Sequence, residues 1–210
     1  MKYINLSLHR SATSSIAKAF RDFGIATLDW VGYEFEAEFQ VDLHHGKLDA
    51  VFDGVYKQFR DRPCWGDYPV PWLYEKIADS NPDAYFFSVI RFPRDWIASS
   101  KRHNYYITNN TDNPTYPGLS PACASIFAYY GMLEDLQNAI DKSWDSVETE
   151  RLFAELFVKH YQRVSDFCSS KGLKYREFYI DDEHLLPNLF TFCDLIEEGV
   201  ALDVKLEKFN

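Results

Sequence analysis

Residues 86–100 read FFSVIRFPRDWIASS, an apolar run that ends at Arg91 and then turns into a helical pattern. The run from Ala84 to Ile90 is almost continuously apolar, which is typical of a central strand in a parallel sheet. The same organisation occurs near the N-terminus, where residues 4–15 read INLSLHRSATSS. The sequence therefore predicts two strand–loop–helix junctions.

Both junctions carry arginine and hydroxyl residues at the point where the strand gives way to the helix. The first turn of a helix presents backbone N–H groups without intrahelical acceptors and the positive end of the helix dipole. Such a position suits a phosphate or a sulfate. Two junctions of this kind predict a ligand with two anionic ends, such as a nucleotide phosphorylated at separate positions.

Strand and helix patterns alternate along the rest of the chain. Strands are expected over residues 2–8, 25–31, 84–90 and 174–180. Helices are expected over residues 14–23, 45–61, 72–80, 93–103, 122–140, 149–170 and 182–198. This alternation predicts one domain over residues 1–210 with a three-layer α/β/α fold around a central parallel sheet.

Residues 104–121 interrupt the alternation, because they contain four Asn, three Pro, three Thr and three Tyr. This composition is too polar and too rich in proline for a core element. We expect a long loop that acts as a lid or a substrate loop, with a plain surface insertion as the alternative.

The net charge of −10 argues against general binding to nucleic acids or membrane surfaces, since both need a basic protein surface. No apolar run approaches 18 residues, so membrane insertion is not expected. The four cysteines show no metal-ligand spacing, and no signal-peptide pattern precedes the first strand. These features predict reduced thiols, no metal site and a cytoplasmic protein.

The first junction offers one guanidinium, four hydroxyl groups and several backbone N–H groups within residues 10–15. It lacks the GxxxxGK[ST] pattern of a P-loop, which speaks against a nucleotide kinase-like enzyme. A hydroxyl run before a helix also serves simply as an N-cap, and that reading remains open.

The second junction places Arg91 at the end of a buried strand, where an unpaired charge is costly. We therefore expect Arg91 to face an anion at the carboxyl edge of the sheet. Ser99 lies eight residues further on and could close on the same anion. The alternative is that Arg91 pairs with an internal carboxylate and Ser99 only packs.

Together the junctions resemble the sulfotransferases that use 3′-phosphoadenosine 5′-phosphosulfate (PAPS). That family has a loop of the form Pro-Lys-Ser/Thr-Gly-Thr-Thr/Ser, which corresponds here to residues 9–14. Its second motif, an Arg with a following turn and a Ser eight residues later, corresponds to residues 91–99. The resemblance extends through residues 67–69 and 81–84 and returns weakly around residues 160–181. It implies a P-loop-type sulfotransferase architecture.

The resemblance implies transfer of a sulfuryl group from PAPS to a hydroxyl or amine of an unidentified small-molecule, glycan or lipid acceptor, without a metal. Arg91 and Ser99 would bind the 3′-phosphate, and Arg10 would also stabilise the leaving phosphate. The 5′-phosphosulfate would be bound by Arg10, Ser11, Ala12, Thr13, Ser14 and Ser15.

Asp67 is the leading candidate for the general base, because it occupies the place where relatives carry a His-x-Pro or comparable segment. An ordinary Asp has a pKa of about 3.9, so burial would have to raise that value. Asp67 could instead be a turn residue that caps the helix starting near Trp72, and His9 and His103 are rival bases.

Two residues depart from the family pattern. Arg10 stands where the family has Lys, and Ala12 stands where it has Gly. Arg is a planar fork rather than a point charge, and a Cβ disfavours positive φ. A protein that binds PAPS or its product but lacks turnover is therefore the alternative function.

Overall fold

The computed structural model describes residues 1–29, 47–110 and 119–200. The chain forms two compact units, which are described here one at a time. The first unit comprises residues 1–30, 55–91 and 164–210, and the second comprises residues 31–54 and 92–163.

The first unit is built on a five-stranded sheet in the order β2-β3-β1-β4-β5, in which every pair is parallel. Strand β1 lies between β3 and β4, so segments far apart in the sequence leave the sheet side by side. The strands are β1 (Tyr3–Asn5), β2 (Thr27–Leu28), β3 (Cys64–Trp65), β4 (Tyr85–Ile90) and β5 (Lys174–Tyr179).

Helices fill most of the remaining described chain. They are α1 (Thr13–Asp22), α3 (Leu48–Phe59), the short 3-10 helix η1 (Val70–Trp72), α4 (Tyr74–Ser80), α5 (Pro93–Asn110), α6 (Pro121–Tyr129), α7 (Leu133–Ile140), α8 (Val147–Ser170) and α9 (Leu185–Phe192).

Several expectations about these elements change. The strand expected over residues 2–8 is shortened to Tyr3–Asn5 and the helix expected over 182–198 to Leu185–Phe192. The strand expected over 25–31 and the helix expected over 45–61 both extend into residues 30–46, which lie outside the described residues. Strand β3 was not predicted, because two buried residues are too few to show a period. The helix expected over residues 122–140 is divided at Gly131, whose φ of 69° ends a helix. Helix α5 continues to Asn110, so the loop expected over residues 104–121 is helical over 104–110, and residues 111–118 lie outside the described residues.

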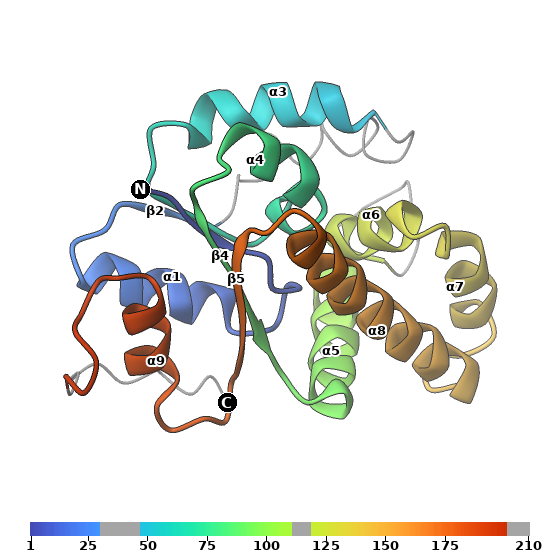
Figure 1. Ribbon diagram of the computed structural model, residues 1–210. Coiled ribbons are helices and arrows are strands. Elements are labelled where there is room, and N and C mark those ends of the chain that lie inside the picture. The colour runs from blue at the N-terminus through green and yellow to red at the C-terminus, as the bar shows by residue number, and fades with distance from the viewer. Residues whose placement is uncertain (30–46, 111–118, 201–210) are drawn as a thin grey trace. The chain divides into compact units, whose positions relative to one another are not determined.

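Helices α1 and α9 cover one face of the sheet (Figure 1). Phe20 of α1 lies at the centre of this layer, with its ring centroid 5.8 Å from that of Phe87 and 5.0 Å from that of Phe190. Both helices present apolar side chains at helical spacing to a sheet face made by alternate strand residues. This layer gathers Tyr3, Ile16, Ala19, Phe20, Cys64, Tyr85, Phe87, Val89, Phe178, Leu185, Leu186, Leu189, Phe190 and Cys193.

The opposite face of the sheet carries a second aromatic layer. The Trp65 ring meets the Tyr56 ring edge-on at 5.8 Å, which brings the end of α3 onto this face. Tyr74 of α4 meets Phe167 of α8 in the same way at 5.2 Å. Helices on both faces of a parallel sheet make the three-layer α/β/α fold that the sequence predicted.

The second unit is helical in its described part. The Trp96 ring of α5 lies 5.9 Å from that of Phe153 and 5.4 Å from that of Phe157, both on α8. Phe127 of α6 meets Phe153 at 5.0 Å. An aromatic cluster therefore holds these three helices together.

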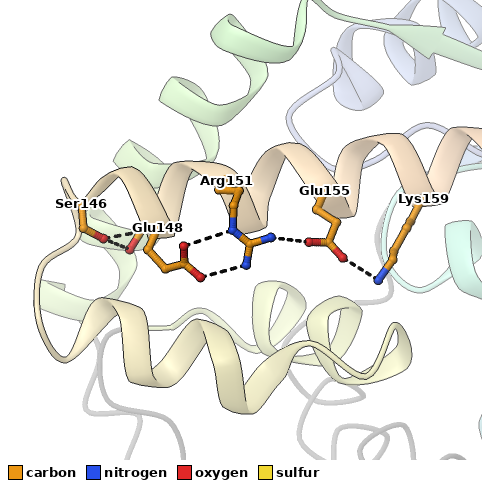
Figure 2. Close-up of polar contacts among 6 residues, drawn as sticks. Ser146, Glu148, Arg151, Glu155 and Lys159 are labelled. Carbon is orange, nitrogen blue, oxygen red and sulfur yellow. Dashed lines mark hydrogen bonds and ion pairs between the residues drawn. The ribbon is translucent and has the colours of Figure 1, made fainter.

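A ladder of alternating charges follows the exposed side of α8 (Figure 2). The Arg151 guanidinium donates to Glu148 at 2.8 and 3.0 Å and to Glu155 at 2.8 Å, and Glu155 also pairs with Lys159 at 2.8 Å. Arg151 accordingly lowers the pKa of Glu148. Spacings of three and four residues put these groups on one helical stripe, so the ladder is a solvated face of the helix.

Across the described residues, no helix combines the length and the apolar character needed to cross a membrane.

Candidate active site

The candidate site lies within the first unit, at the carboxyl ends of β1, β3 and β4. Tyr3 is in register with both Cys64 and Tyr85, so the three neighbouring strands run level with one another. The loops that follow β1 and β3 and the residue that follows β4 therefore come together at one edge. Such an edge is the usual ligand-binding position of an open parallel sheet.

A buried polar network fixes the end of β1. The Asn5 Oδ1 atom accepts hydrogen bonds from the backbone N–H of Ser7 at 3.0 Å and from the Ser7 hydroxyl. The Ser7 Oγ atom in turn accepts from the backbone N–H of Val89 at 2.7 Å, which ties the loop to β4. A Cβ added at Gly66 would lie 3.0 Å from the Asn5 Cβ, so β3 also approaches closely.

These supporting residues were missed by the sequence reasoning. The sequence signal for them is weak, because Asn5 and Ser7 are simply two polar residues in an otherwise apolar segment. In the structure both residues are almost fully buried.

The loop after β1 has an unusual backbone. Arg10 and Ala12 both adopt left-handed conformations, with φ of 68° and 61°. The first hydrogen bond of α1 runs from the Ile16 N–H to the Ala12 carbonyl at 3.0 Å, and no side chain caps the helix. The N–H groups of residues 13–15 therefore have no intrahelical acceptor and are suited to an anion.

The hydroxyl groups of this loop differ in their surroundings. Ser14 is exposed at the start of α1, whereas Ser11, Thr13 and Ser15 are buried. Ser15 is only 7% exposed, and its Oγ has no hydrogen-bond partner among the described residues. A buried hydroxyl without a partner is costly, so Ser15 is suited to a polar ligand at the helix start.

Asp67 follows β3 with φ of 60° and points toward α1. Its Oδ2 atom accepts from the Thr13 hydroxyl at 2.6 Å, and its Oδ1 atom accepts from the Tyr68 N–H at 2.8 Å. Burial raises the pKa of Asp67, although both hydrogen bonds act in the opposite direction. Asp29 also raises this pKa, and Arg10 lowers it.

The alternative role of Asp67 is supported in part: Asp67 belongs to the turn before η1, but its side chain does not cap that helix. The 3-10 helix η1 has Pro69 at its N-cap position, and no side chain caps it. Asp67 contributes to that turn through its backbone carbonyl, which accepts from the Val70 N–H at 2.8 Å. The carboxylate itself faces the loop after β1.

Arg91 follows directly after β4 and is half-buried. One guanidinium nitrogen lies 3.5 Å from the carbonyl oxygen of Arg10, so the two junctions lie side by side. Among the described residues, no carboxylate forms an ion pair with Arg91. The alternative reading, in which Arg91 neutralises an internal carboxylate, therefore has no support there.

The structure thus brings together Arg10, Thr13, Asp67 and Arg91. Ser99 is buried on α5 in the second unit, and a joint clamp with Arg91 stays a prediction. His103 also belongs to the second unit, and His9 is buried in the loop after β1. In the described ranges, no group of three or more His, Cys, Asp or Glu side chains is arranged to hold a metal ion.

Replacing Ala12 with Gly should stabilise the protein by about 0.5–1 kcal/mol, because the left-handed conformation costs an L-residue about 1–2 kcal/mol and glycine much less. The gain is measured as the free energy of unfolding in a urea titration. Ala17→Gly, inside the α1 helix that Ala12 precedes, is the matched control and should destabilise by about 1 kcal/mol. Destabilisation by Ala12→Gly would contradict the left-handed assignment.

The comparison with protein-family models gives one match. The model described as the sulfotransferase domain matches residues 2–180, which include both junctions and Asp67. No curated protein matches the chain.

Proposed function

Because the chain belongs to the sulfotransferase family, we propose that it transfers a sulfuryl group from PAPS to a hydroxyl or amine of an acceptor molecule. Family membership supports sulfotransfer in general. We propose, in addition, the donor, the residues that bind it and the class of acceptor.

One observation carries the choice of donor: the half-buried Arg91 guanidinium, without an ion pair among the described residues, lies beside the uncapped start of α1. These are two positive positions in one small region of an acidic protein. A ligand with two separate anionic groups would satisfy both, and a bisphosphorylated nucleotide is such a ligand.

The loop after β1 would hold the 5′ end of the donor. The N–H groups of residues 13–15 and the Ser15 hydroxyl supply hydrogen bonds, and Arg10 supplies positive charge. Arg91 would bind the 3′-phosphate, together with Ser99. PAPS supplies an activated sulfuryl group whose leaving group is a phosphate, so stabilising charge on that phosphate lowers the barrier.

Asp67 would take the proton from the acceptor. A carboxylate becomes a better base as its pKa rises toward neutrality, and burial shifts the pKa of Asp67 in that direction. Its position beside the start of α1 puts the base next to the proposed donor site. An acceptor held between them would meet the sulfuryl group in line with its leaving phosphate.

The proposal is tested by thermal unfolding with added nucleotide. The product 3′-phosphoadenosine 5′-phosphate should raise Tm by several degrees at 100-fold excess over its Kd, because a ligand that binds only the folded state stabilises it by about 2.7 kcal/mol at that excess. ATP with Mg²⁺ should raise Tm little. Equal stabilisation by both nucleotides, or by neither, would count against PAPS as the donor.

A protein that binds the nucleotide without turnover is the second candidate, and Arg10 in place of the family's Lys favours it. Ala12 does not add to that case, because its backbone already has the left-handed conformation for which glycine is suited. Stabilisation by the nucleotide without sulfate transfer to a broad acceptor panel would select this candidate.

The acceptor would be a small molecule, a glycan or a lipid. We place the reaction in the cytoplasm, since Cys64, Cys123, Cys168 and Cys193 are all free and buried.

A further inference from the structure

The Thr13 hydroxyl joins two halves of the candidate site that are 54 residues apart in the sequence. It donates to the Asp67 Oδ2 atom at 2.6 Å, which is a short hydrogen bond to a charged acceptor. A hydroxyl has one proton to donate. While Thr13 donates to Asp67, the same hydroxyl cannot donate to a phosphate oxygen.

Thr13 is also the first residue of α1, so its backbone N–H belongs to the group that faces the proposed donor phosphate. Thr13 is only 4% exposed. Water therefore has little access to the hydroxyl, and a lost bond to Asp67 has to be replaced by a bond to another group in the site.

From this geometry we propose that Thr13 is a positioning residue that couples the protonation of Asp67 to the stabilisation of the leaving phosphate. The inference rests on the proposed function and deepens it. Before transfer, Thr13 donates to the ionised Asp67 and orients it toward the acceptor. After Asp67 has taken the acceptor's proton, Thr13 turns its own proton toward the phosphate.

With a hydroxyl acceptor, one bond to sulfur forms and one breaks. The acceptor oxygen forms a bond to sulfur, and the bond between sulfur and the bridging oxygen breaks, so the phosphate leaves with the electron pair. The acceptor proton moves to the carboxylate of Asp67. The protonated carboxyl donates to Thr13 Oγ1, and the Thr13 O–H is released to donate to a phosphate oxygen. Water takes the proton from Asp67 after the products leave.

Two other charged groups also shift the pKa of Asp67, and their effects must be distinguished from the effect of the Thr13 hydroxyl. Asp29 raises the pKa of Asp67, and Arg10 lowers it. Neither depends on the Thr13 hydroxyl, so a change confined to that hydroxyl leaves both effects in place. The Thr13 hydrogen bond itself lowers the pKa of Asp67.

The first test measures the pKa of the Asp67 carboxyl by NMR, with and without 3′-phosphoadenosine 5′-phosphate. In the unaltered protein the nucleotide should raise this pKa, because Thr13 turns away and an anion arrives. Thr13→Val removes the hydroxyl and keeps the branched shape. It should raise the pKa in the free protein and reduce the further rise on binding. Thr13→Ser should behave like the unaltered protein.

The same variants separate this inference from the proposed function. If the nucleotide binds and Thr13→Val shows the same pKa values and the same rise as the unaltered protein, the coupling is wrong while the donor assignment stands. If the nucleotide does not bind the unaltered protein, the proposed function itself fails. Thr13→Ala gives the same comparison if the Val variant does not fold.

Activity gives a second readout once an acceptor is known. Thr13→Val should lower kcat about tenfold with KM for the acceptor unchanged, and it should move the acid limb of the kcat profile to higher pH. Thr13→Ser should restore both. A lower kcat with an unmoved acid limb would indicate a structural role alone and would overturn the coupling.

Discussion

Replacing Arg91 with Ala should weaken the binding of 3′-phosphoadenosine 5′-phosphate at least about 30-fold, because the loss of a charged partner in a partly buried site costs about 2 kcal/mol or more. Arg91 follows directly after β4 and is half-buried. Arg91→Lys should retain part of the affinity, since a point charge replaces a two-pronged donor.

Calorimetric titration of the purified variants measures this loss. Arg94→Ala is the matched control, because Arg94 is an exposed arginine only three residues away. Adenosine 5′-phosphate is the matched ligand, since it lacks the 3′-phosphate and its weaker binding should not change in Arg91→Ala. Unchanged binding of the bisphosphate nucleotide by Arg91→Ala would show that the second junction has been assigned wrongly.

Asp67→Asn should lower the rate of sulfate transfer by about 10²–10⁴-fold, the usual contribution of a general base. Binding of the nucleotide should persist, because the change keeps the size of the side chain and the left-handed backbone that Asn tolerates. The amide oxygen can still accept from the Tyr68 N–H. Single-turnover rates, measured together with nucleotide affinity, test both parts.

The same variant should be as stable as the unaltered protein at neutral pH, or more stable. Folding raises the pKa of Asp67, so the folded state favours the protonated form. The contribution of Asp67 to stability therefore falls as pH rises from its unfolded pKa, about 3.9, through its folded pKa. At pH values above the folded pKa, the ionised Asp67 carboxylate destabilises the folded state, and the uncharged Asn side chain removes this destabilisation.

The pH dependence of activity should have the opposite sign, because a base must be ionised. Activity should fall as pH drops through the raised pKa of Asp67, and Tm of the two proteins should converge over the same range. Asp29→Asn, at the neighbouring acid, should shift the acid limb to lower pH without abolishing activity. Full activity in Asp67→Asn would transfer the role of base to His9 or His103.

The fold was predictable where a single segment carries its own pattern. β4 was recognised because six neighbouring residues are almost all apolar, and α1 because its buried residues recur at helical spacing. β3 was not predicted from the sequence, because Cys64 and Trp65 form a strand only through pairing with β1 and β2. The polar residues at the end of α5 suggested a loop, yet none of residues 104–110 is a proline or a glycine.

The candidate site was predictable where the residues of one anion site lie close together in the sequence. The spacing within residues 9–15 and 91–99 was enough to expect two anion sites. The hydrogen bond between Thr13 and Asp67 was not predictable, since it depends on β1 and β3 lying side by side. That Ser15 Oγ has no hydrogen-bond partner among the described residues likewise depends on packing around the helix start rather than on residues near it in the sequence.

The way the chain passes between its units bears on how such enzymes diversify. It leaves the first unit directly after Arg91 and returns at Val164, after which β5 pairs with β4 over six residues. Recombination at these two crossings would exchange residues 92–163, Ser99 among them, between relatives, while the loop after β1, Asp67 and Arg91 would be inherited together with residues 31–54 of the second unit. The second crossing falls inside α8. An exchanged segment therefore has to keep the 3.6-residue periodicity of this helix continuous across the junction, so that its side chains stay on the same faces.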